Sequence, residues 1–311
     1  MGRNRMAFNI SAALVLSVLF SSSVMAQATR TWVSGVGDDA NPGSRTAPCK
    51  TFAGAISRTA AGGEINCLDP GGFGAVTITK AITIDGHGTL ASILGAGTNG
   101  IVINAGASDV VTIRNISING AASGLNGIGF IAGAALHIED CVIFNFSQKG
   151  VDFAPTGASR LFISDTIIRN NNNAANGGAV RLAAGAAGSV VATMDRVRMH
   201  GNTFGVFAAV RTTAIVRDSE ISSNTANGIF ASGNALAPIS VHVEDTLISD
   251  CQARGIRSDG SMSTIRISND TVVHNFTGLA VNSGGKIVSF GNNRIEGNMT
   301  DGAPTSTIVL K

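Results

Sequence analysis

The sequence contains no tyrosine, one tryptophan and only six prolines among its 311 residues. Extended sites for sugars and nucleic acids usually stack their ligands on aromatic side chains, so this shortage disfavours such sites. Charged residues make up 14% of the chain and nearly balance, giving a formal net charge of +2. Because they are scattered, no basic stretch of the kind that binds nucleic acid or anionic lipid is present. We therefore expect no nucleic-acid partner.

Long apolar runs are also missing, apart from one near the N-terminus. There, Arg3 and Arg5 precede an apolar run over residues 12–20 and small residues that end at Ala26. This order is typical of a secretory signal peptide, with cleavage expected after Ala26. The run is well short of the roughly 20 apolar residues that a membrane span needs, and no later segment is long enough. The sequence predicts no membrane span, and export to the periplasm, the cell surface or the medium.

Cysteine is scarce, with four residues in the chain. Export permits disulfides, and Cys49 and Cys67 lie in the same N-terminal region, where they could either pair or stay free. Cys141 and Cys251 lie about four repeats apart, which at about 4.8 Å per repeat exceeds the reach of a disulfide. We expect these two to be free thiols packed as small apolar side chains.

A repeated unit fills most of the chain, and the segment VHVEDTLISDCQARGI over residues 241–256 is typical of it. Each unit has a short alternating strand, an acid or amide, an apolar residue, a second acid or amide, and a glycine that begins the next strand. The first acid or amide recurs at Asn115, Asp140, Asp165, Asp195, Asp218, Asp245, Asn269 and Asn292. The second recurs at Asn145, Asn170, Asn202, Asn224, Asp250, Asn275 and Asn298. A period of about 23 to 30 residues is typical of solenoids.

The repeats favour strands over helices, because they are rich in Val, Ile, Thr, Asn and Gly and alternate with a period of two. Three short strands in each repeat predict a triangular coil. The recurring amides fit this coil, since identical side chains at stacked bends can hydrogen-bond along a ladder. We therefore interpret the recurring Asn and Asp residues as structural.

The segment before the repeats, WVSGVGDDANPGSRTAPCKTF, resembles the opening motif of secreted right-handed parallel β-helix proteins of the pectin-lyase-like superfamily. The residues that carry the resemblance are Trp32, Val33, Ser34, Gly37, Asp38, Asn41, Pro42, Gly43, Pro48, Lys50 and Thr51. The resemblance implies an all-β, right-handed parallel β-helix with a short N-terminal capping helix. It is specific for the fold and not for one activity.

The predicted boundaries are 1–26 for the signal peptide, 27–64 for a first strand and the capping helix, and 65–311 for the β-helix. Thr51 is a candidate N-cap, and we expect Gly62 and Gly63 to end the helix. Its apolar face would carry Phe52, Ala55, Ile56 and Thr59. At the other end, either residues 298–306 fold over the last coil or the open edge binds a partner, and we favour the first arrangement.

Three sequence features could carry chemistry. The pairs His137/Glu139 and His242/Glu244 lack a third metal ligand, so we expect Glu139 and Glu244 to form ion pairs with Arg114 and Arg217 instead. The Gly-His-Gly at Gly86 to Gly88 is similar to a polygalacturonase motif, but the companion Asn-Thr-Asp, Asp-Asp and Arg-x-Lys motifs are absent. Asp85 has no second carboxylate, which glycoside hydrolysis needs, so we predict a turn there.

Lys149 and Asp152 are the remaining catalytic candidates, because polysaccharide lyases of this fold use a Lys or Arg base near acid clusters. Lys149 is the only lysine inside the repeats with an acidic residue close to it in the sequence. We expect neither a metal nor another cofactor.

One predicted surface row could bind a polymer. The residue after each glycine–apolar pair gives Gly129, Asp152, Arg181, Phe207, Phe230, Arg257 and Ala280. If these residues face outward, Phe207 and Phe230 would stack on a ligand between charged neighbours. A register shift of one would instead turn both phenylalanines into the core. Because large apolar residues are mostly buried, the inward arrangement is the expected one.

The sequence thus leaves three functional hypotheses. The first is an exported β-helix scaffold or binding protein, with a polysaccharide as ligand by analogy with the superfamily. The second is a polysaccharide lyase or glycoside hydrolase with a divergent site. The third is a structural or adhesin-like surface protein that self-associates through its C-terminal edge.

Overall fold

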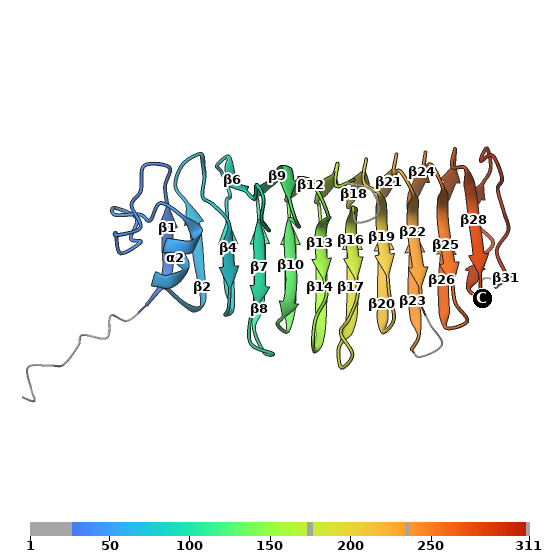
Figure 1. Cartoon of the computed structure of the whole chain (residues 1–311), viewed down its shortest axis with the longest axis horizontal. Coiled ribbons are helices and arrows are strands. Elements are labelled where there is room, and N and C mark those ends of the chain that lie inside the picture. The colour runs from blue at the N-terminus through green and yellow to red at the C-terminus, as the bar shows by residue number, and fades with distance from the viewer. Residues whose placement is uncertain (1–26, 173–176, 234–236, 309–311) are drawn as a thin grey trace, which may run out of the picture.

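The computed structural model describes residues 27–172, 177–233 and 237–308, and it is an elongated parallel β-solenoid (Figure 1). The chain passes in turn through three parallel sheets, which we name A, B and C. Each sheet gains one strand per coil, so residues about 25 positions apart lie side by side. This confirms the predicted all-β parallel solenoid. The predicted signal peptide, residues 1–26, lies outside the described residues.

Sheet A consists of β1 (Ala28–Val33), β2 (Thr59–Cys67), β5 (Ile82–Asp85), β8 (Val110–Arg114), β11 (Ala135–Glu139), β14 (Ala158–Ser164), β17 (Ser189–Asp195), β20 (Thr212–Arg217), β23 (Ile239–Glu244), β26 (Ser263–Ser268), β29 (Lys286–Ser289) and β31 (Ser306–Thr307). Sheet B consists of β3 (Gly71–Gly72), β6 (Ala91–Leu94), β9 (Ser117–Gly124), β12 (Val142–Phe146), β15 (Ile167–Arg169), β18 (Arg198–His200), β21 (Glu220–Ser222), β24 (Leu247–Ser249), β27 (Thr271–Val273) and β30 (Arg294–Ile295). Sheet C consists of β4 (Val76–Ile78), β7 (Ile101–Asn104), β10 (Ile128–Ala132), β13 (Lys149–Phe153), β16 (Gly178–Leu182), β19 (Phe204–Ala208), β22 (Asn227–Ser232), β25 (Arg254–Asp259) and β28 (Thr277–Asn282).

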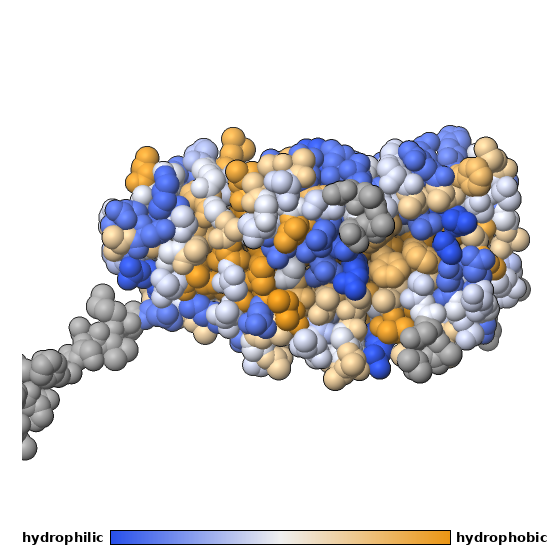
Figure 2. Space-filling view, viewed as in Figure 1, coloured by the Kyte–Doolittle hydropathy of each residue, from blue (hydrophilic) through white to orange (hydrophobic). Residues whose placement is uncertain are grey.

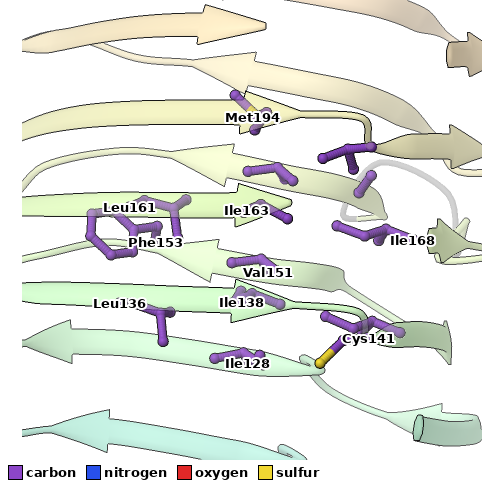
Figure 3. Close-up of a cluster of buried hydrophobic side chains, with 14 of the residues drawn as sticks. Ile128, Leu136, Ile138, Cys141, Val151, Phe153, Leu161, Ile163, Ile168 and Met194 are labelled. Atoms are coloured by element: carbon purple, nitrogen blue, oxygen red, sulfur yellow. The ribbon is translucent and has the colours of Figure 1, made fainter. Parts of the chain in front are cut away.

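The core fills the inside of the coil, because side chains of successive strand residues point alternately inward and outward. Inward residues are mostly Ile, Val and Leu, and the close-up in Figure 3 shows Leu136, Ile138, Val151 and Ile163 packed between the sheets. Stacked coils bring like residues into contact, as Ile138 aligns with Ile163 in register. The outer faces of the sheets are therefore free to carry other side chains.

The bend between sheets A and B uses a left-handed residue in most coils. These residues, with φ between 50° and 58°, are Asn115, Asp140, Asp165, Arg196, Asp218, Asp245 and Asn269. Asn and Asp adopt this conformation at low cost, which explains six of the eight predicted positions. The prediction for Asp195 is wrong by one residue. Asp195 ends β17 in register with Ser164 and Arg217, and the bend falls on Arg196.

The bend between sheets B and C contains the predicted amide ladder. The Oδ1 atom of Asn202 accepts from the backbone N–H of Asn171 at 3.1 Å, and that of Asn224 accepts from Asn202 at 3.0 Å. Asn275 and Asn298 repeat the contact at 2.9 Å. Other predicted ladder residues, Asn145, Asn170 and Asp250, instead take the left-handed position one residue earlier, with φ of 57° to 60°.

A short helix, α2 (Phe52–Arg58), covers the first coil as predicted. The hydroxyl of Thr51 accepts from the backbone N–H of Gly54 at 2.9 Å, which is the expected N-cap. The expectation that Gly62 ends the helix is wrong. Thr59 already has extended backbone angles, and its hydroxyl bonds to that of Thr31 at 2.8 Å, so β2 begins there.

At the C-terminus, residues 298–307 form a partial last coil. The backbone N–H groups of Gly278 and Leu279 donate to Thr300 and Asp301, at 2.8 and 2.9 Å, and β31 pairs with β29. This agrees with the expected self-capping, while self-association stays a prediction. No helix among the described residues is long and apolar enough to cross a membrane.

The possible disulfide between Cys49 and Cys67 is not formed, and both are buried free thiols. Val33 lies between them, because it pairs with Cys67 on one side and bridges to Cys49 on the other. Two strand spacings amount to about 9.6 Å, beyond the reach of a disulfide. Cys141 and Cys251 are buried free thiols as predicted, and both occupy core-facing positions just after a bend.

Candidate functional site

Sheet C carries a row of outward positions, one from each strand from β7 to β28. The parallel register aligns Val102, Gly129, Asp152, Arg181, Phe207, Phe230, Arg257 and Ala280 on consecutive strands. Neighbouring members are therefore about 4.8 Å apart along the backbone ladder. We name this set the sheet C row. It contains the residues predicted from the sequence, in the predicted order.

The expected inward packing of Phe207 and Phe230 is wrong. Both side chains are half-buried on the outer face, whereas the inward position beside Phe207 is held by Val206, which is fully buried. Two glycines fix this register. A Cβ atom on Gly205 would lie 2.6 Å from the carbonyl oxygen of Gly228, so a slip that places a larger residue there is sterically excluded.

A charged group occupies the middle of the row. The guanidinium of Arg181 donates to the Asp152 carboxylate at 2.8 Å, and both side chains remain partly exposed. Lys149 lies on the same strand as Asp152 and interacts electrostatically with Asp152 and Arg181. Burial lowers the pKa of its amine, the Asp152 charge opposes this shift, and the Arg181 charge adds to it. The structure thus brings the predicted Lys149 and Asp152 together and adds Arg181 to them.

An aromatic group follows. The ring centroids of Phe207 and Phe230 are 5.3 Å apart, and Phe204 adds a third ring 5.7 Å from Phe207. The guanidinium of Arg257 lies over the Phe230 ring, 4.7 Å from its centroid, and its Nε donates to Asp259 at 3.0 Å. The ion pair with Asp259 holds the Arg257 guanidinium over the Phe230 ring.

Phe204 and Asp259 were missed from the sequence. Asp259 lies two residues after Arg257 on β25, and Phe204 lies three residues before Phe207 on β19. Because outward side chains recur every two residues along a strand, the sequence offers a signal for Asp259 but not for Phe204. Figure 2 shows the combined surface, with hydrophilic atoms over β13 and β16, an apolar area over β19 and β22, and hydrophilic atoms again over β25.

Toward the N-terminus the sheet C row is apolar, and its side chains are small or absent. Gly129 has no side chain, and a Cβ atom added there would have no neighbour closer than 4.0 Å. Beyond it, Val102 lines a groove of about 350 Å³ with Ala53 and Ile56 of α2. The row is therefore continuous with a shallow apolar groove at the capped end.

A second group of charged side chains lies at the bends between sheets A and B. Arg196 makes a bidentate pair with Asp165, at 2.7 and 2.8 Å, and also contacts Asp195. Asp165 and Arg196 line a groove of about 670 Å³. Because this ion pair uses the charges of both side chains to join neighbouring bends, we interpret the groove as structural.

The predicted ion pairs of Glu139 and Glu244 do not form, although the register places these residues beside Arg114 and Arg217 as expected. Arg114 pairs with Asp85 at 3.0 Å and Arg217 with Asp195 at 3.1 Å, so each arginine forms its ion pair with an aspartate of the preceding coil.

Asp85 is the last residue of β5, and the turn predicted there follows it at His87 and Gly88. Its carboxylate accepts hydrogen bonds from the backbone N–H of His87 at 2.8 Å and from the Asn115 amide at 3.0 Å. Across the described part of the chain, no three His, Cys, Asp or Glu side chains converge as a metal site would require.

Known proteins match this chain at the level of the fold. A family model of the right-handed β-helix region matches residues 99–299. An alginate lyase from Paenibacillus sp. str. FPU-7 superposes with a TM-score of 0.56 and 15% identity, covering 90% of this chain and 98% of that one. Pectate lyase Pel9A superposes with a TM-score of 0.51 and 14% identity, covering 85% of this chain and 76% of that one. No curated protein sequence matches significantly.

Proposed function

This chain belongs to the right-handed β-helix family, within the pectin-lyase-like superfamily, and we propose that it is an exported protein that binds a polysaccharide along sheet C. The observation that carries the proposal is the outward pair Phe207 and Phe230, which lies between two charged groups in the sheet C row. Two proteins of similar fold are named as lyases of pectate and alginate, which supports a polysaccharide as the class of ligand.

The geometry of the row suits an extended polymer. Its members repeat at the strand spacing of about 4.8 Å along the solenoid axis, a period similar to the advance of one pyranose unit. The phenylalanine rings offer apolar faces for stacking, and the ion pairs offer donors and acceptors for hydroxyl groups. A sugar chain lying parallel to the axis would contact several members at once.

The charges favour an acidic polysaccharide. Lys149, Arg181 and Arg257 outnumber Asp152 and Asp259 on this surface. Guanidinium groups form charge-assisted, often bidentate contacts with carboxylates, which a uronic acid polymer would supply. We expect binding to weaken as salt is added, because exposed charges are screened.

The test is binding to a glycan array and then to the positive glycans in solution. Phe207→Ala and Phe230→Ala should each weaken binding by about 5- to 150-fold, since stacking on an aromatic ring contributes about 1 to 3 kcal/mol. Phe162→Ala is the matched control, because Phe162 is a half-buried phenylalanine on the outer face of sheet A, stacked on His137 at 4.7 Å. Equal loss in all three variants, or no glycan binding at all, would refute the proposal.

A second candidate function, a polysaccharide lyase, is favoured by the position of Lys149 on the same strand as Asp152, which pairs with Arg181 at 2.8 Å. In its unprotonated form, which burial favours, the Lys149 amine would take the proton from the carbon next to a uronate carboxylate while the Arg181 guanidinium neutralises that carboxylate. The electron pair of that C–H bond would form a carbon–carbon double bond as the glycosidic C–O bond breaks, and the leaving oxygen would take a proton from water.

Incubation with pectate, alginate and hyaluronan, with and without calcium, tests for that product by its ultraviolet absorbance. Activity that is present in the parent protein and absent from Lys149→Ala and Asp152→Ala would establish the lyase. Absence of unsaturated product from every substrate would leave binding as the function.

A further inference from the structure

A second pocket lies at the N-terminal end of the solenoid, on the outer side of sheet A. It has a volume of about 450 Å³, and it is formed by β1, the loop at Pro42 to Ser44, and the end of α2. Trp32, the single tryptophan of the chain, lines it together with Arg30 and Arg58. The sheet C row lies on another sheet of the coil, so the two sites are separate.

The backbone of Trp32 is held by two hydrogen bonds to the loop over residues 43–49. Its N–H donates to the carbonyl of Gly43 at 2.8 Å, and its own carbonyl accepts from Cys49 at 3.0 Å. Thr31 and Val33 are fully buried, so the indole between them points outward, and it remains only half-buried. Because the indole is attached to a fixed backbone, it loses little conformational entropy when a ligand ring stacks on it.

Two guanidiniums flank the indole. Arg30 lies two residues before Trp32 and so shares its face of β1, and it pairs with Glu64 at 3.0 Å. Arg58, in the last turn of α2, donates to the carbonyl of Asp39 at 3.2 Å. Each guanidinium has five N–H donors, so one such bond leaves donors for a ligand. The amide of Gln27 donates to the carbonyl of Ser57 at 2.8 Å and closes the remaining wall.

We propose that this pocket binds a single sugar ring that carries a carboxylate, such as a terminal uronic acid. The ring would stack on Trp32, and its carboxylate would bind Arg30 and Arg58. The pocket volume suits a small ligand, and apolar lining with a few convergent polar groups is typical of such sites. The inference does not depend on polymer binding along sheet C, because no residue is shared between the two sites.

The single tryptophan makes the test specific. With no tyrosine and one tryptophan in the chain, fluorescence excited at tryptophan wavelengths arises from Trp32 alone. The purified protein is titrated with glucuronate, with glucose as a neutral ring of the same size, and with acetate as a carboxylate without a ring. We expect a saturable change with glucuronate and an affinity for glucose and acetate that is lower by about tenfold or more.

Variants separate this site from the sheet C row. Arg30→Gln and Arg58→Gln should weaken the glucuronate response while the circular dichroism spectrum and melting temperature stay those of the parent, whereas Phe230→Ala should leave the response unchanged. Equal responses to glucose and glucuronate, no response to glucuronate, or a response that survives both arginine variants would each overturn the proposal. Loss of response in Phe230→Ala would also overturn it, because the two sites would then not be separate.

Discussion

Asp270 is a carboxyl group buried inside the coil, and we predict that replacing it with asparagine stabilises the protein above neutral pH. It follows Asn269 at the bend between sheets A and B and is 0% exposed. Its two oxygens accept from the backbone N–H groups of Thr246 at 3.0 Å and Ser268 at 3.1 Å. In the next coil Asn293 accepts from the Asp270 backbone in the same way, at 2.8 Å, so an amide is compatible with this position.

Burial raises the pKa of Asp270 to about 7, from an ordinary value of 3.8. The two backbone N–H groups lower the pKa, and the charges of Asp245 and Glu244 raise it further. Between pH 3.8 and about 7 the folded state binds a proton that the unfolded state has released, so stability falls as the pH rises through this window. The difference corresponds to about 4 kcal/mol at pH 8, at roughly 1.36 kcal/mol per pKa unit.

Asp270→Asn removes this cost but loses one acceptor oxygen. If the Ser268 N–H then lacks a partner, the loss is about 1 to 3 kcal/mol, which leaves a net gain of about 1 to 3 kcal/mol at pH 8. The gain should disappear near pH 4, where the folded carboxyl is neutral and the unfolded one is only partly ionised, so burial of the group costs little extra.

Thermal unfolding by circular dichroism at pH 4, 6 and 8 measures the effect. The control is Asp250→Asn, at an exposed left-handed bend where asparagine is equally suitable, and it should show no such pH dependence. A gain that is the same at pH 4 and pH 8, or a variant less stable than the parent at pH 8, would refute the reasoning.

Three further predictions follow from the coil and the sheet C row. Gly129→Leu should weaken binding of long acidic glycans by about tenfold, because the leucine side chain fills the open space above Gly129 in the sheet C row. Gly129→Ala should have little effect, and calorimetric titration of both variants measures the difference. Asn275→Ala should lower the free energy of unfolding in denaturant by about 3 kcal/mol, because the Cys251 N–H loses its acceptor and three hydrogen bonds from the Asn275 amide are lost. A change below about 0.5 kcal/mol would show that the ladder contributes little to stability. All four cysteines should react with a thiol reagent in denaturant. Cys141 and Cys251 should not react in the native protein at pH 8, because burial raises their pKa values to about 12 and about 11. Fewer than four reactive thiols in denaturant would show that a disulfide is present.

The repeat predicted the coil because one pattern of strand, bend and glycine recurs with little variation. It placed Asn202, Asn224, Asn275 and Asn298 in the ladder. It misplaced Asp195 and Asn170 by one residue, because Asp and Asn suit both the left-handed bend and the position next to it. Single-residue register of this kind depends on the contacts between stacked coils.

The candidate sites were less predictable for the same reason. The order of the sheet C row followed from the repeat, but whether Phe207 faced inward depended on the close approach of Gly205 and Gly228. Similarly, Arg114 and Arg217 could each pair with a carboxylate in either adjacent coil, and side-chain geometry decided between them. The Trp32 pocket joins β1 to the end of α2, a contact that no periodic pattern indicates.

Binding of a polysaccharide along the outer face of sheet C can be seen in a crystal structure of the protein with a bound acidic oligosaccharide. We predict sugar rings stacked on Phe207 and Phe230, with the chain parallel to the solenoid axis and carboxylates at Arg181 and Arg257. An oligosaccharide bound on the outer face of sheet A or sheet B, with the sheet C row empty, would contradict the account.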